Sequence, residues 1–124
     1  MAAGEISGQI SRLIEQSRSL EAVGDIGGAF QLATEAVQLS QAEGDSAGTA
    51  AALLGLAYVH FRIGHDEEVI RLARQALDLA PADSRLKVDA LMMLGAAGEA
   101  VTFKRFLAIF HLQEIRMAAP VAAP

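Results

Sequence analysis

The chain has 124 residues, of which 52% are hydrophobic and only 5% aromatic, and this length and composition fit one folded domain. Its formal net charge of -5 at pH 7 argues against a nucleic-acid-binding protein, because such proteins normally present a basic surface. The chain contains no cysteine, which excludes disulfide bonds, thiolate metal sites and cysteine nucleophiles.

The first residues, MAAGEISGQISRL, lack the basic start and the apolar run of a secretory signal. Residues 1–5 are expected to be disordered ahead of the first helix. The longest stretch without a charge, residues 46–61, is shorter than the ~20 residues that a membrane helix needs. It predicts a buried helix of a soluble, cytoplasmic protein.

The sequence repeats itself at intervals close to 40 residues. A shift of 40 superimposes Leu13 on Leu53, Gly24 on Gly64, Leu32 on Leu72, Ala33 on Ala73, Ala36 on Ala76 and Leu39 on Leu79. A shift of 38 superimposes Asp45 on Asp83, Ser46 on Ser84, Leu53 on Leu91, Leu56 on Leu94 and Ala57 on Gly95. Repeats of this length indicate stacked helical hairpins. Six helices are predicted in three pairs: residues 6–23 and 27–43, 46–63 and 66–80, and 84–97 and 102–118.

Local signals mark where these helices begin and end. The Asp-Ser pairs at 45–46 and 83–84 provide side-chain oxygens that cap the starts of helices. Gly24 and Gly64 suit the hairpin turns, because glycine adopts positive φ without strain. Pro81 ends the fourth helix, because it lacks an N–H group and disfavours helix in the preceding residue.

The second hairpin is predicted to pack through small side chains. One helix presents a stripe of Leu53, Leu56, Ala57 and His60, and the next presents Val69, Leu72, Ala73 and Ala76. The alanines let the two backbones approach closely, so a bulky residue at Ala73 or Ala76 is expected to overpack the contact.

This hairpin resembles the tetratricopeptide repeat family. The motif of that family has large, large, small, aromatic, Gly, small, Ala and Pro residues where this chain has Leu53, Leu56, Ala57, Phe61, Gly64, Val69, Ala76 and Pro81. Leucine replaces the usual tryptophan at 53, and valine replaces the usual alanine at 69. The 40-residue spacing, with the extra loop 41–45, is similar to a variant common in bacterial signalling proteins. The resemblance covers residues 10–117 and implies an all-α, right-handed superhelical solenoid of three hairpins over residues 6–118.

The resemblance also implies a binding surface on the concave face, which the first helix of each hairpin lines. The family's ligand-facing positions correspond to Ile14, Arg18, Glu21, Leu54, Gly55, Tyr58, Phe61, Arg62, Asp89, Met92, Met93 and Glu99. Of these, Arg18, Leu54, Tyr58, Arg62 and Met92 are our candidates for peptide binding. The Lys and Asn residues that grip a C-terminal dicarboxylate in chaperone adaptors of the family are absent from these positions. We therefore expect a non-catalytic adaptor or scaffold that binds an apolar or helical peptide of a partner protein.

The last predicted helix carries an aromatic stripe of Phe103, Phe106 and Phe110, with further apolar residues around it. A helix of this composition needs burial on more than one side. The alternative function is therefore dimerisation or regulation within a larger signalling or transcription-regulatory protein, with these three residues in the self-association surface. Residues 119–124, rich in Ala and Pro, are expected to form a tail or a linker.

No catalytic, cofactor or metal site is predicted. Residues 24–28, Gly-Asp-Ile-Gly-Gly, form a glycine-rich segment that lacks the following Lys-Ser/Thr sequence of a nucleotide-binding loop. His60 and His65 lie on either side of Gly64 and are not expected to share a helix face, and His111 has only Glu114 beside it. Asp66, Glu67 and Glu68 stand in the first turn of a predicted helix, where negative charge stabilises the helix dipole.

Overall fold

The computed structural model describes residues 3–118, including all side chains except those of residues 3, 110 and 113–118. The described part folds into five α-helices: α1 (Ala3–Ala22), α2 (Ile26–Ala42), α3 (Ser46–Arg62), α4 (Asp66–Leu79) and α5 (Arg85–Ala118). Helix α1 begins at Ala3, whereas helix was predicted from residue 6. Residues 1–2 and the predicted tail 119–124 lie outside the described residues.

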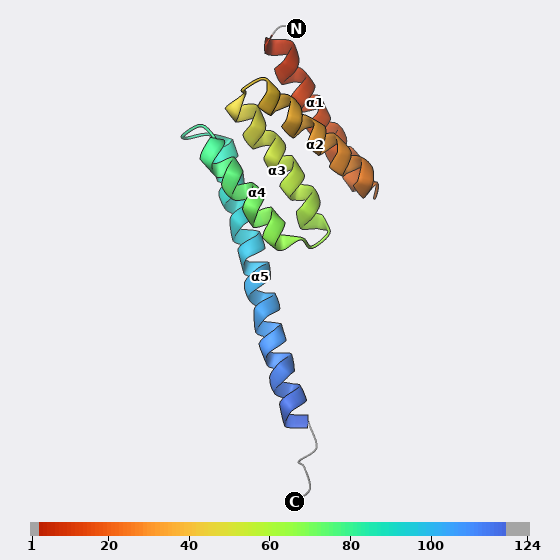
Figure 1. The fold of residues 1–124 in the computed structure, drawn as a ribbon, viewed down its shortest axis with the longest axis vertical. Coiled ribbons are helices and arrows are strands. Elements are labelled where there is room, and N and C mark those ends of the chain that lie inside the picture. Colours follow the sequence, from red (N-terminus) through yellow and green to blue (C-terminus); the bar gives the residue numbers. More distant parts are fainter. Residues whose placement is uncertain (1–2, 119–124) are drawn as a thin grey trace, which may run out of the picture.

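Helices α1 and α2 form one hairpin, and α3 and α4 form a second hairpin that packs against the first (Figure 1). The turns follow the sequence signals, because Gly24 and Gly64 have φ angles of 88° and 81°. The Asp45 side chain accepts a hydrogen bond of 2.8 Å from the Gly48 N–H and so caps α3. Helix α4 ends at Leu79, two residues before Pro81. The all-α helical repeat architecture is confirmed.

Alanines occupy the contacts between neighbouring helices. In the second hairpin Ala57 on α3 and Ala73 and Ala76 on α4 have no exposed surface. Ala57 and Ala76 belong to the same core cluster as Leu53 and Leu72. The first hairpin is built in the same way, with fully buried Ala29, Ala33 and Ala36 on α2. Small side chains let the helix axes approach closely, as predicted. The uncharged segment 46–61 is the central helix α3, which confirms the predicted buried helix.

The predicted third hairpin is wrong, because residues 85–118 form one continuous helix of 34 residues. Under the 38-residue shift the counterpart of Gly64 is Thr102, which strongly disfavours positive φ. The Thr102 hydroxyl instead donates a hydrogen bond of 2.9 Å to the Gly98 carbonyl, one turn earlier in the helix. No capping Asp or Ser follows that could start a further helix, and Gly98 does not adopt a positive φ angle, so α5 continues through residues 98–102.

The two halves of α5 have different surroundings. Ala90 and Ala97 in the first half are fully buried in the main core, and α5 contacts both α3 and α4. The second half extends beyond the other four helices (Figure 1). Phe103 and Phe106 there are 60% and 61% exposed. The third predicted self-association residue, Phe110, has a side chain outside the described ones.

Candidate functional site

A groove of about 670 Å³ crosses the face formed by α1, α3 and α5. These helices are the first members of successive repeats, so the groove lies on the face that the sequence predicted to be concave. Four of the five candidate peptide-binding residues line it: Arg18, Leu54, Tyr58 and Met92. The remaining lining residues are Ser11, Ile14, Glu15, Ala51, Phe61, Arg85, Leu86, Asp89, Met93 and Ala96.

The base of the groove is apolar and its edges are polar. Leu54 is buried, Tyr58 is half-buried, and Met92 on α5 is 64% exposed. Gly55 on α3 is buried next to Leu54. A Cβ atom on Gly55 would lie 3.5 Å from the Ile14 side chain of α1. Since 3.5 Å is an ordinary van der Waals distance, an alanine Cβ atom at this position would fit between α1 and α3 without displacing either helix.

Arg18 is the cation at the α1 edge of the groove. It makes no ion pair or hydrogen bond with the part of the chain that the structure describes. Arg85 at the opposite edge has its Nε atom 3.0 Å from the Asp89 carboxylate of the next helical turn. Arg18 is thus available for a carboxylate of a bound molecule, whereas Arg85 already has a partner.

The fifth candidate, Arg62, does not line the groove. Its Nε atom lies 2.5 Å from the Oε1 atom of Glu21 and so links α3 to α1. The Glu21 side chain is only 6% exposed, so this pair neutralises a nearly buried carboxylate next to the groove. The family resemblance placed both residues on the ligand-facing side, but it gave no sign that they bind each other.

A comparison with protein-family models agrees with this geometry. The model of the tetratricopeptide repeat matches residues 13–82. The chain belongs to the tetratricopeptide repeat family. The match covers α2, α3 and α4 and the second half of α1, and it stops before α5, where the structure departs from the repeat. No curated protein and no solved structure gives a significant match.

Tetratricopeptide repeats generally mediate protein–protein interaction and are typically non-catalytic. The groove of this chain has the mixed apolar and charged lining that such an interaction uses. None of the described helices is both long enough and apolar enough to cross a membrane.

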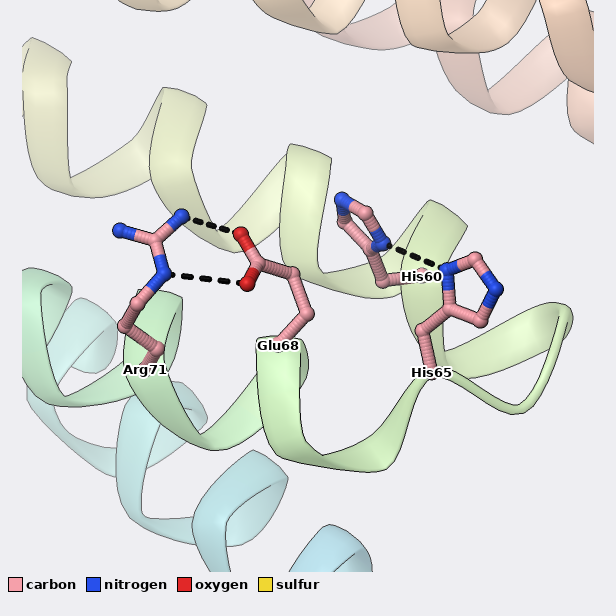
Figure 2. Close-up of polar contacts among 4 residues, drawn as sticks. All are labelled: His60, His65, Glu68 and Arg71. Carbon is pink, nitrogen blue, oxygen red and sulfur yellow. Dashed lines mark hydrogen bonds and ion pairs between the residues drawn. The ribbon is translucent and has the colours of Figure 1, made fainter.

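A second cluster lies where α3 turns into α4 (Figure 2). The Nδ1 atoms of His60 and His65 are 3.2 Å apart, so the turn brings together two rings that do not share a helix. The Glu68 carboxylate accepts two hydrogen bonds from Arg71. Within the described residues, no three His, Asp or Glu side chains are grouped so that they could hold a metal ion.

The pKa of His60 is lowered from 6.5, chiefly because the ring is partly buried. Glu68 opposes this shift, whereas His65 and Arg71 add to it. The ring of Phe30 meets His60 edge-on at a centroid distance of 4.7 Å. A protonated His60 would thus stand against an apolar ring and next to a second histidine.

We expect the repeat to lose stability as the pH falls below about 6.5. The pKa of His60 in the folded chain lies below its value in the unfolded chain. Between these two pKa values the unfolded chain therefore binds more protons, and the folded state loses stability as the pH falls. Urea unfolding at pH 7.5 and pH 5.5 measures the loss. His60→Phe keeps a ring beside Phe30 but takes up no proton, so its pH dependence should be weaker. An equal pH dependence in His60→Phe, or a weaker one in a His111→Gln control, would contradict the assignment.

Proposed function

We propose that the protein is a cytoplasmic adaptor whose groove between α1, α3 and α5 binds a helix or an extended segment of a partner protein. The observation that carries this proposal is the groove that crosses three helices, with buried Leu54 in its lining and Arg18 unpaired within the described residues at its edge.

The lining indicates the chemistry of the bound segment. Tyr58, Phe61 and Met92 offer aromatic and thioether surface that suits large apolar side chains. Arg18 suits an acidic side chain of the same segment. An amphipathic helix with apolar residues at i, i+3 or i+4 and one flanking carboxylate combines both features.

The double variant Arg18→Glu with Met92→Glu should weaken partner binding at least about 10-fold. The first substitution reverses the charge at position 18, and the second adds a carboxylate at position 92 that the bound partner would strip of water. The matched control is Arg12→Glu, an exposed charge reversal on α1 outside the groove lining. Quantitative pull-down with the parent chain and both variants would identify the partner, and titration calorimetry with that purified partner would measure affinity. Equal affinity of the double variant and the parent would place the binding surface elsewhere.

A second candidate function is dimerisation of a larger signalling or transcription-regulatory protein through the last helix. Four large apolar side chains on the second half of α5 favour it, because each is about 60% exposed: Phe103, Phe106, Ile109 and Leu112. A contiguous apolar surface of this kind marks an interaction site in a water-soluble domain. Light scattering on the purified chain tests this function, since a strict monomer would contradict it.

A further inference from the structure

We propose that two copies of the chain pair through antiparallel α5 helices, so that the second half of each α5 covers the first half of the other. Each copy would then supply the helix that the third repeat of its partner lacks. This inference rests on the self-association proposed above and specifies its face, its direction and its register.

The pairing face follows from the internal repeat. Leu53 and Ala57 on α3 are 4% and 0% exposed in the core that α3 and α4 form. Their counterparts on α5 are Leu91, which is 54% exposed, and Gly95, which is also exposed. The surface that α4 buries in the second repeat is therefore open to solvent in the third.

This open surface continues onto the second half of α5. A shallow groove of about 680 Å³ is lined by Leu94, Gly95, Gly98, Glu99, Thr102, Phe103 and Phe106. Positions 91, 95, 98, 102, 106 and 109 recur at helical spacing and lie on one side of α5. Ala90 and Ala97, which are buried against the main core, lie on the other side.

Gly95 and Gly98 fit a close approach by another helix. Each glycine inside a helix costs about 1 kcal/mol relative to alanine. A Cβ atom at either position would meet nothing within 4 Å, so the single chain gives no packing reason for them. Opposite a second helix they would form the recesses that receive large side chains of the partner.

The occupant is a second copy because the chain itself contains the matching segment. Under the repeat shift residues 104–117 are the counterpart of α4, yet they cannot fold back while α5 is continuous. Six exposed apolar side chains lie on or beside the face: Val88, Leu91, Phe103, Phe106, Ile109 and Leu112. At roughly 100 Å² each, two copies would bury roughly 1,200 Å², which reaches the range of stable interfaces.

Charge favours the antiparallel direction. Residues 1–84 contain five basic and twelve acidic residues, whereas residues 85–124 contain five basic and three acidic ones. The acidic repeats lie at one end of α5, which is about 50 Å long (Figure 1). Parallel helices would bring two acidic bodies side by side. Antiparallel helices direct the two bodies in opposite directions along α5 and place the more basic second half of each α5 beside the acidic body of the other copy.

The register follows from Thr102, the counterpart of Gly64 at the tip of the second hairpin. With the twofold axis near Thr102, Gly98 of one copy faces Phe106 of the other, and Gly95 faces Ile109. The interface is then isologous and closed, which limits assembly to a dimer.

Light scattering and equilibrium sedimentation of variants on α5 test which face of this helix forms the dimer. The parent chain should be a dimer, and Ile109→Glu should raise the dimer Kd at least about 100-fold, because the charge enters the interface twice. Gly98→Leu should also weaken the dimer while leaving the helix content intact, since no atom of the monomer lies within 4 Å of a Cβ atom at this position. The matched control Ala108→Glu lies on the side of α5 that continues from Ala97 and should dimerise like the parent. Unchanged dimers in Ile109→Glu and Gly98→Leu would overturn the proposed face.

Cysteine cross-linking tests the direction, and the natural chain contributes no background. A mixture of Leu91→Cys and Leu112→Cys chains should cross-link between different chains through a short bismaleimide, whereas Leu91→Cys alone should not cross-link. Thr102→Cys alone should cross-link to itself. A dimer in which Leu91→Cys links to itself would overturn the antiparallel inference but keep self-association. A monomer at all concentrations would overturn both.

Discussion

Leu72→Ala is expected to lower the free energy of unfolding by about 2–5 kcal/mol. Leu72 is 2% exposed and lies on α4 in the main core with Leu53 and Val69. Removing three carbons there loses the transfer free energy of the side chain and leaves a cavity between closely packed helices. Urea unfolding followed by circular dichroism measures the effect.

The matched control for this prediction is Leu79→Ala on the same helix. Leu79 is 38% exposed, so its truncation removes less buried surface and should cost well under half as much. Because α4 contacts both α3 and α5, the loss should appear in one cooperative transition. Equal losses in the two variants would show that the main core does not centre on Leu72.

The hairpins could be predicted from the sequence because their determinants are local. Gly24 and Gly64 supply positive φ angles at the turns, and Asp45 caps the start of α3. Pro81 prevents α4 from continuing. Each of these signals acts within a few residues and is visible in one chain. The alanine stripes then set which faces meet, so the pairing of helices followed as well.

The continuous α5 could not be predicted in the same way. The repeat shift indicated a third hairpin, although the same shift places Thr102 where a turn needs glycine. The N-terminal cap of α5 also differs, since Asp83 takes a φ of 59° and Ser84, not Asp83, accepts a hydrogen bond from the Lys87 N–H. Similarity of the apolar pattern thus outweighed the missing turn residue in the prediction.

The groove was partly predictable. Family positions identified Arg18, Leu54, Tyr58 and Met92, which the structure brings together. They did not identify the edge residues Ser11, Glu15 and Arg85, although the first two lie one helical turn from known lining positions. Contacts between side chains of different helices, such as Arg62 with Glu21 or Lys104 with Asp66, depend on the final packing and carry no local signal.

The contact between α3 and α4 makes a further prediction about an added side chain. Ala76→Leu should lower the free energy of unfolding by about 1–3 kcal/mol, because Ala76 has no exposed surface and three added carbons overpack the helix pair. Gln75→Leu is the matched control on the same helix; its position is exposed, so the change should stay within about 0.5 kcal/mol. Urea unfolding of both variants decides the comparison.

The same substitution links the core to the groove. Ala76 holds α4 close to α3, and α5 packs on both of these helices. Pushing α4 outward would carry α5 with it and widen the groove between Leu54 on α3 and Met92 on α5. Ala76→Leu should therefore lower partner affinity without altering any lining residue, whereas Gln75→Leu should not. Full affinity in a destabilised Ala76→Leu chain would show that the groove keeps its shape independently of the alanine contact, and that the close approach of the two helices serves stability alone.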